Sequence, residues 1–190
     1  MQTFREYYED GEHLKDKDTI AILPGGFKPP TRGHFLAMQD LLKDANSGIV
    51  YIGKGERDGI DAAKSKAIWD IYKNYLSKPT EVHLSPISPV ADTYDYALDN
   101  KEVDIIVGAG GPRRLKDGTM TKGDMKRYES FTKNKEKYPH VTLKEIESQE
   151  DIKGDDVRVA IKANIDDALK NYFPDISETD KDLIKNILTD

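Results

Sequence analysis

The chain has 190 residues, with 29 Lys and Arg against 35 Asp and Glu and a net charge of −6 at pH 7. That length suits one compact domain with a short appendage rather than two full domains. Cysteine is absent, which excludes disulfides, thiolate nucleophiles and Cys-ligated metals. No apolar run approaches the ~20 residues of a membrane span, and the polar N-terminus lacks a signal-peptide core, so we expect a cytoplasmic protein without a membrane partner.

The charge is unevenly distributed along the chain. Residues 111–127 carry six Lys and Arg and two Asp, a local charge of +4 that leaves −10 on the rest. A nucleic acid would require a broader basic surface. We therefore expect a small anionic ligand such as a phosphate ester and no nucleic-acid partner, with a solvated loop rich in Lys and Arg as the alternative.

Apolar runs and helical periods alternate along most of the chain. Residues 1–18 are polar and carry three aromatics at the spacing of a short helix. Short apolar runs predict strands at 19–23, 49–52, 82–84, 103–107 and 141–146. Apolar residues at helical spacing predict helices around 35–42, 62–77, 94–98, 125–131, 157–169 and 177–188. The last helix opens on Ser177 and Asp180 as a capping box. Its buried face is expected to contain Leu183, Ile184, Ile187 and Leu188.

Strands that alternate with helices indicate an α/β protein with a parallel sheet. We expect a Rossmann-like doubly wound sheet of about five parallel strands with helices on both faces, formed by residues 19–190, and an N-terminal extension at 1–18. Ligands of such sheets bind beyond the carboxyl ends of the strands, where the strand order reverses. The glycines that end three of the strands are therefore expected around one crevice: Gly25, Gly26, Gly53, Gly55 and residues 108–111.

The most informative segment follows the first predicted strand and reads Pro24-Gly25-Gly26-Phe27-Lys28-Pro29-Pro30-Thr31-Arg32-Gly33-His34. Its two adjacent glycines let the backbone approach a ligand closely. A helix begins at the end of the segment, where backbone N–H groups and the helix dipole favour an anion. We expect His34 to point a ring N–H at that anion and Lys28 to add a mobile cation. The alternative is a strand-to-helix turn in which His34 only caps the helix.

This segment resembles the Thr/His-x-Gly-His motif of the nucleotidyltransferase superfamily, which includes cytidylyltransferases and the nicotinamide-nucleotide and phosphopantetheine adenylyltransferases. The resemblance spans residues 19–172, and phage-encoded members look most similar. It implies transfer of AMP or CMP from an NTP to a small phosphorylated acceptor, release of pyrophosphate, and Mg²⁺ bound through the nucleotide phosphates. The catalytic residues it implies are His34, Lys28 and Thr31, and the nucleotide contacts it implies are Gly25, Gly26, Phe27 and Gly33.

Residues 152–158 are similar to the second motif of that superfamily, Ile-Ser-x-Thr-x-x-Arg. The Arg is present as Arg158, while Lys153 replaces Ser and Asp155 replaces Thr. The resemblance implies that Arg158 and Lys153 bind the nucleotide. A carboxylate at position 155 caps a helix well, but it repels a triphosphate unless Mg²⁺ bridges the two. The alternative is an N-capped amphipathic helix with solvated ends.

The loops after the second and fourth strands complete the predicted site. The resemblance places a phosphorylated acceptor at the first of these loops and the base and ribose at the second. The predicted contacts are Gly108 and Gly110 for the nucleotide, and Lys54, Arg57, Arg113 and Arg114 for the acceptor or for phosphates. In the alternative, Glu56 and Asp58 pair with the cations of a solvated loop.

Two functions are compatible with these residues. The intact first motif favours a nucleotidyltransferase. The altered second motif and the N-terminal segment favour a catalytically inactive nucleotide-binding module of the same fold, with a regulatory or virion-assembly role. Related enzymes commonly self-associate, so a homo-oligomer is compatible with either function. If the chain is phage-encoded, the cytoplasm in question is that of the host.

Overall fold

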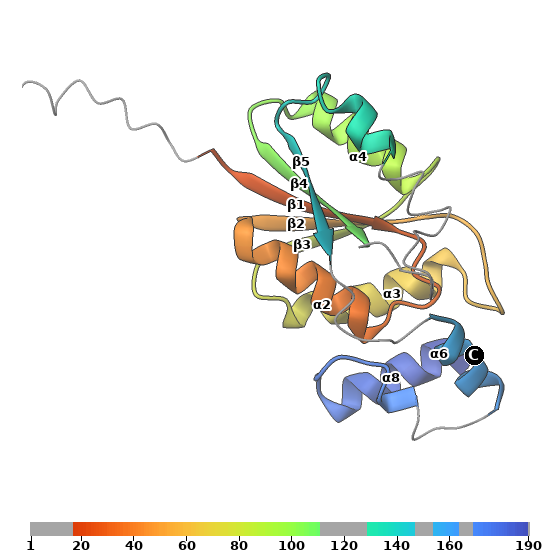
Figure 1. Ribbon diagram of the computed structural model, residues 1–190. Coiled ribbons are helices and arrows are strands. Elements are labelled where there is room, and N and C mark those ends of the chain that lie inside the picture. Colours follow the sequence, from red (N-terminus) through yellow and green to blue (C-terminus); the bar gives the residue numbers. More distant parts are fainter. Residues whose placement is uncertain (1–16, 111–128, 147–153, 164–168, 190) are drawn as a thin grey trace, which may run out of the picture.

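The computed structural model describes residues 17–110, 129–146, 154–163 and 169–189. Five strands form one parallel sheet in the order β3-β2-β1-β4-β5 (Figure 1). Their bounds are Thr19–Gly25 (β1), Ser47–Ile52 (β2), Thr80–Leu84 (β3), Asp104–Gly110 (β4) and Val141–Ile146 (β5). The five predicted strands and the Rossmann-like α/β architecture are confirmed.

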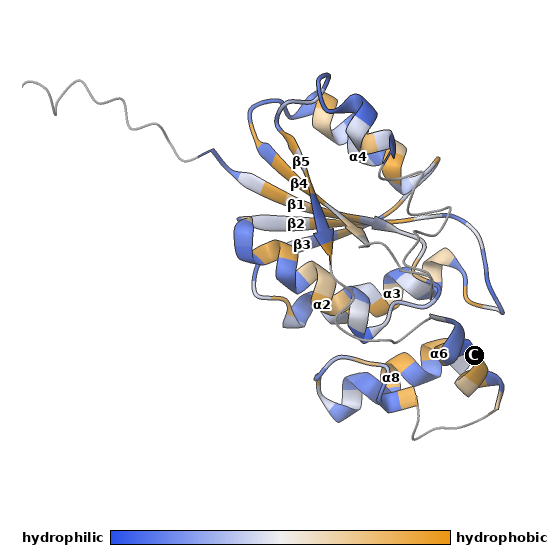
Figure 2. Cartoon of the chain, viewed as in Figure 1, coloured by the Kyte–Doolittle hydropathy of each residue, from blue (hydrophilic) through white to orange (hydrophobic). Residues whose placement is uncertain are grey.

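Helices cover both faces of this sheet. The described helices are α2 (Arg32–Leu41), α3 (Ala62–Tyr72), α4 (Pro89–Asp99), α6 (Gly154–Lys162) and α8 (Glu178–Thr189), and residues 129–134 are also helical. Of these, α6 and α8 lie beyond α2 and α3 and do not cover the sheet itself (Figure 1). Helices α2 and α3 lie on one face, whereas α4 and the 129–134 helix lie on the other (Figure 1). In the hydropathy view the orange, apolar residues lie along the strands and on the inner sides of these helices (Figure 2).

Alternation along the strands divides the core into two clusters. The cluster on the α2 and α3 face includes Ala21, Leu23, Val50, Ile52 and Trp69. The cluster on the α4 face includes Ile22, Ile49, Ile105, Val107 and Phe131. A parallel sheet covered on both faces buries both side-chain sets, which is why its strands have continuous apolar runs.

The order of the strands indicates which edge of the sheet would bind a ligand. From β1 the chain proceeds through β2 to β3, and then crosses to β4 on the other side of β1. The order therefore reverses between β1 and β4, and the carboxyl ends of β1, β2 and β4 lie at one edge of the sheet. The ends of β1 and β2 are joined directly, because the Gly53 N–H donates to the Gly25 carbonyl at 2.8 Å.

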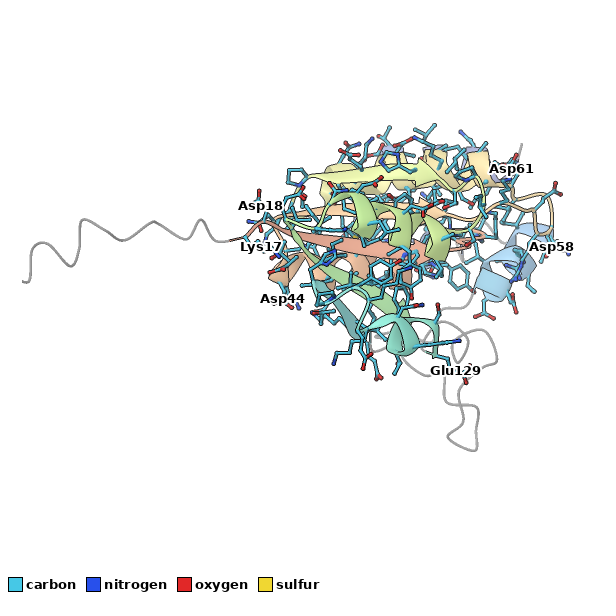
Figure 3. All side chains as sticks on the ribbon, turned by 90° about the horizontal axis from the view of Figure 1, so that it is seen from above. Lys17, Asp18, Asp44, Asp58, Asp61 and Glu129 are labelled. Carbon is cyan, nitrogen blue, oxygen red and sulfur yellow. The ribbon has the colours of Figure 1, made fainter. Side chains whose placement is uncertain are left out.

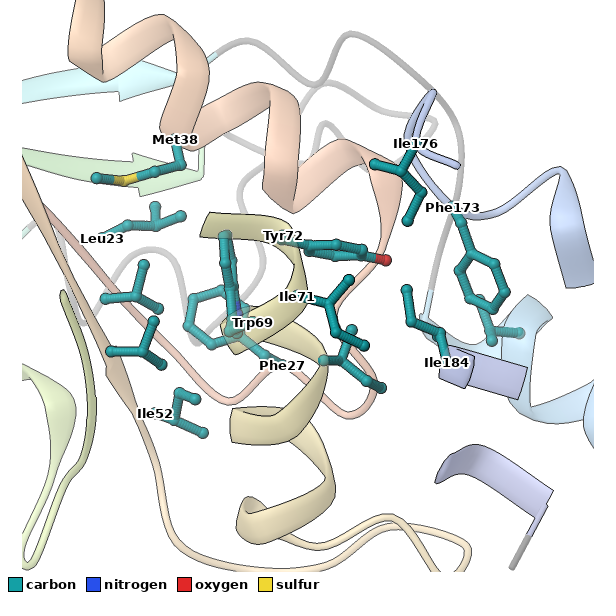
Figure 4. Close-up of a cluster of buried hydrophobic side chains, with 14 of the residues drawn as sticks. Leu23, Phe27, Met38, Ile52, Trp69, Ile71, Tyr72, Phe173, Ile176 and Ile184 are labelled. Atoms are coloured by element: carbon teal, nitrogen blue, oxygen red, sulfur yellow. The ribbon is translucent and has the colours of Figure 1, made fainter. Parts of the chain in front are cut away.

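The C-terminal helices pack against α3 and extend the same core (Figure 4). Phe173, Ile176 and Ile184 are buried beside Tyr72 of α3 in this cluster. The Ser177 cap is confirmed, because its hydroxyl accepts from the Asp180 N–H at 3.1 Å.

Three predicted features of the helices and the chain end have different outcomes. The expected burial of Leu183 is wrong, because that residue is 48% exposed and only the Ile184 side of α8 faces α3. The predicted 62–77 helix ends as an α-helix at Tyr72 and continues as a 3₁₀ turn, Lys73–Tyr75. Residues 1–16 of the predicted extension lie outside the described residues. Within the described ranges, no helix has the length and apolar character to cross a membrane.

Adjacent residues of α8 provide a test of this packing. We expect Ile184→Ala to lower the free energy of unfolding by about 2–5 kcal/mol, because it removes a fully buried side chain, and Leu183→Ala to lower it by about 1 kcal/mol or less. Urea denaturation of the two variants measures the difference. Equal losses would contradict the docking of α8 on α3.

Candidate functional site

The turn between β1 and α2 lies against α3 through Phe27. This residue is buried, and its ring packs edge-on against Trp69 at 5.4 Å and against His34 at 5.0 Å between centroids. Its φ of +49° is a conformation that L residues rarely adopt, so burial of the ring has to compensate the local strain. A Cβ on Gly25 would come within 2.6 Å of the Phe27 ring, which explains the glycine there. Gly26 is exposed with open space beside its Cα, where a ligand could approach.

His34 and Thr31 form the cap of α2. The Thr31 N–H donates to Nδ1 of His34 at 3.0 Å, and the Thr31 hydroxyl lies 3.0 Å from the same nitrogen. Because Nδ1 accepts from a backbone N–H, a neutral His34 carries its proton on Nε2. The Nε2–H of His34 is therefore an N–H donor in the first turn of the helix, while Nδ1 serves the cap. Gly33 lies in this first turn between the two residues.

Lys28 is a buried lysine rather than the mobile cation expected from the sequence. It is 8% exposed, and its Nζ donates to the carbonyls of Gly26 at 2.7 Å and Gly53 at 3.2 Å. Desolvation lowers the pKa of Lys28, with Asp61 raising it and Arg57 lowering it further. The ammonium thus joins the loops after β1 and β2 and places a positive charge between them.

Arg158 of α6 reaches the turn after β1. Its Nη1 donates to the Lys28 carbonyl, its Nη2 pairs with Asp155, and its Nε donates to Asp58 at 2.8 Å. A Cβ on Gly154, the first residue of α6, would lie 3.2 Å from that same Lys28 carbonyl. The structure therefore brings Gly154 and Arg158 of the second predicted motif onto the first. Asp155, which the sequence placed against a triphosphate, is paired with Arg158 instead.

The loop after β2 is exposed from Lys54 to Gly59. Lys54 and Arg57 form no side-chain hydrogen bond or ion pair with the described residues, so both can meet an anion. Asp58 pairs with Arg158 and, at 2.5 Å, with Lys162, and it lies beside α6 in Figure 3. The alternative in which Asp58 pairs with Lys54 or Arg57 is wrong, because α6 supplies Arg158 and Lys162 as its partners.

The predicted contacts after β4 are described only in part. Gly108 and Gly110 lie at the end of β4, on the expected edge. Gly108 is buried, and a Cβ there would come within 2.6 Å of Leu41 and Ile146 side chains, so packing against α2 and β5 explains this glycine. Arg113, Arg114 and Lys153 lie outside the described residues.

Ser65 is a site residue that the sequence analysis missed. It is fully buried on α3, and its hydroxyl donates to the Phe27 carbonyl at 2.6 Å and lies 2.8 Å from the Asp61 carbonyl. It therefore anchors the turn after β1 from a residue 38 positions away. A serine on the buried face of an amphipathic helix is the signal that could have indicated it, since a buried hydroxyl requires a partner.

Solved structures of two other proteins share this fold. TmcAL from Thermotoga maritima, solved with α-thio ATP bound, is similar over 90% of this chain, with a TM-score of 0.54 and 12% identity, and the match covers 55% of the TmcAL chain. A Vibrio parahaemolyticus protein provisionally named a nicotinate-nucleotide adenylyltransferase is similar over 91% of this chain and 96% of its own, with a TM-score of 0.59 and 18% identity. Neither a family model nor a curated protein sequence matches the chain. At these identities the similarity establishes the fold.

The burial of Lys28 has a pH-dependent consequence. Its pKa in the folded protein lies below 10.5, so between the two values the unfolded chain binds the proton more tightly. The contribution of Lys28 to stability should therefore rise with pH. We expect the free energy of unfolding of the wild type, minus that of Lys28→Met, to increase as the pH approaches 10.5. Urea denaturation of both proteins across alkaline pH measures this, and a constant or falling difference would contradict the burial.

Proposed function

We propose that the protein is a nucleotidyltransferase that transfers an AMP or CMP moiety from an NTP to a small phosphorylated acceptor and releases pyrophosphate. The observation that carries the proposal is the state of His34: its Nδ1 is occupied by the Thr31 N–H, so its Nε2–H is the donor. That donor lies in the first turn of α2, at the end of the turn that contains the buried Lys28, on the ligand-binding edge of the sheet. Helix N-termini and oriented N–H donors favour phosphate.

In the proposed reaction, a phosphate oxygen of the acceptor attacks the α-phosphorus of the NTP. The bond from the α-phosphorus to the oxygen bridging to the β-phosphorus breaks, and pyrophosphate leaves. His34 Nε2–H and the first turn of α2 stabilise the charge that develops on the phosphoryl oxygens. Lys28 uses two of its three N–H groups on carbonyls, and the third is available for a phosphate. Such a transfer depends on positioning and charge stabilisation and requires no protein nucleophile.

The remaining predicted residues take the roles that the resemblance implies. The proposed nucleotide contacts are Gly25, Gly26, Phe27, Gly33, Gly108, Gly110, Lys153 and Arg158, and the proposed acceptor or phosphate contacts are Lys54, Arg57, Arg113 and Arg114. Arg158 uses three of its five N–H groups within the protein, so two can reach a phosphate.

Mg²⁺ is the proposed metal. Among the described residues, no three His, Asp or Glu side chains gather into a metal cluster. Mg²⁺ is commonly bound through substrate phosphates with few protein ligands, which suits these residues. Bound in this way, the ion would neutralise charge on the transferred phosphoryl group.

Two substitutions at position 34 separate capping from catalysis. His34→Asn places an amide oxygen near the position of Nδ1, so the cap of α2 can persist while the Nε2 donor is lost. We expect pyrophosphate release from ATP or CTP, Mg²⁺ and a panel of phosphorylated small molecules to fall about 10²–10³-fold, with a nearly unchanged melting temperature. His34→Gln, which can place an N–H near Nε2, should retain more activity.

His83→Asn is the matched control. His83 is an exposed histidine on β3 that pairs with Glu81, away from α2, and its replacement should leave the activity unchanged. If neither ATP nor CTP at millimolar concentration raises the melting temperature of the wild type, the proposed function is wrong.

A second candidate function is nucleotide binding without catalysis, in a regulatory or assembly role. Its supporting observation is that Arg158 carries two carboxylate partners, Asp58 and Asp155, which reduce the positive charge it offers to a phosphate. The same assay distinguishes the two functions. A nucleotide that raises the melting temperature, with no pyrophosphate released for any acceptor, favours the binding module.

A further inference from the structure

We propose that Asp58 is a positioning residue that locks the two loops of the candidate site to each other through Arg158. The inference deepens the proposed function and names a residue that neither predicted motif contains. Asp58 lies in the loop after β2, whereas Arg158 holds the carbonyl of Lys28 in the loop after β1. The Asp58 carboxylate is thus hydrogen-bonded to the same guanidinium, that of Arg158, that holds the turn after β1.

The contacts around Asp58 form a continuous chain. One carboxylate oxygen accepts from Nε of Arg158 at 2.8 Å, and the other accepts from Lys162 at 2.5 Å. The Arg158 side chain is only 11% exposed, and its fork divides between Asp58, Asp155 and the Lys28 carbonyl. A guanidinium that binds in fixed directions transmits the position of one partner to the next.

A second connection, through the Lys28 side chain, also joins the segments after β1 and β2. The ammonium of Lys28 donates to the carbonyls of Gly26 and Gly53, one in each loop. The turn after β1 is therefore held at the Lys28 side chain by the loop after β2, and at the Lys28 carbonyl by α6. Asp58 joins α6 to the loop after β2 and so completes a ring of three segments.

Electrostatics alone and a positioning role predict opposite changes in nucleotide affinity when the charge of Asp58 is removed. A carboxylate near a phosphate site repels the ligand, so its neutralisation would strengthen triphosphate binding. A positioning role predicts weaker binding, because the donors of the turn after β1 lose their alignment. The sign of the change therefore distinguishes the two effects.

The test uses Asp58→Asn in the full chain. Asp58 has a φ of +52°, which Asn tolerates as well as Asp does, so the substitution removes the charge without straining the backbone. The control is Asp70→Asn on α3, whose carboxylate also pairs with two cations, Lys66 at 2.6 Å and Lys73 at 2.8 Å, outside the two loops.

Two measurements are made on each variant. Hydrogen exchange in the ligand-free protein follows the Thr31 amide, which donates to His34, and the Ile60 amide, which donates to the Arg57 carbonyl. Calorimetry with Mg²⁺ and ATP or CTP gives the dissociation constant. For Asp58→Asn we expect exchange of both amides to quicken about 10-fold and the dissociation constant to rise about 10-fold. Asp70→Asn should change neither quantity.

The two readouts separate this inference from the proposed function. Unchanged exchange at Thr31, or equal or tighter nucleotide binding by Asp58→Asn, would overturn the positioning role even if the wild type binds nucleotide. Faster exchange of both amides in a protein that binds neither nucleotide would support the positioning role and contradict the proposed function.

Discussion

The candidate site depends on how the turn after β1 satisfies its backbone carbonyls. The turn leaves the sheet after Gly25, so its carbonyls lose their ladder partners while much of the segment is buried. Buried carbonyls require hydrogen bonds, and here side chains from other elements provide them. The carbonyls of Gly26, Phe27 and Lys28 accept from Lys28 Nζ, Ser65 and Arg158 respectively. These bonds keep the negative ends of three peptide dipoles occupied, which favours an anion at the same edge.

The same bonds explain why the cations of the site are preorganised. Lys28 and Arg158 are held by carbonyls and carboxylates of the protein and do not need to be ordered by a ligand. Preorganised charge stabilises a transition state without a cost of reorganisation during the reaction. Burial opposes this arrangement, because it lowers the pKa of Lys28 and so disfavours its charged form. The balance between hydrogen bonding, which favours the charged form of Lys28, and desolvation, which disfavours it, determines how much positive charge Lys28 contributes at this edge of the sheet.

The C-terminal helices contribute to the site as well as to the core. Trp69 and Tyr72 of α3 pack on Phe27 and on the C-terminal segment in one cluster, so the buried face of α3 contacts both the turn and the helices beyond it. Docking of α6 then brings Arg158 to a carbonyl that is 130 residues away in the chain. Packing and site geometry are therefore set by the same contacts.

Local patterns in the sequence were sufficient for most of the elements. The apolar runs predicted all five strands, because a covered parallel sheet buries both faces and leaves continuous hydrophobic stretches. The Ser177 cap was predictable because a capping box is a contact between residues three positions apart. Burial of Leu183 was not predictable in this way, because the width of an apolar stripe does not show which part of it a neighbouring helix covers.

By itself, then, the sequence determined the succession of strands and helices along the chain, the edge of the sheet at which glycine-rich segments end the strands, and the histidine in the first turn of α2. The order of the strands within the sheet was decided by the tertiary structure. The tertiary structure decided the partners of Asp58, the burial of Lys28 and the anchoring of Phe27 by Ser65. Neighbouring residues suggested Arg57 as the partner of Asp58, but α6, 100 residues further along the chain, supplies Arg158. The physical reason is that helix and strand periods depend on residues a few positions apart, whereas charge pairing and desolvation depend on which segments the packing of the core brings together.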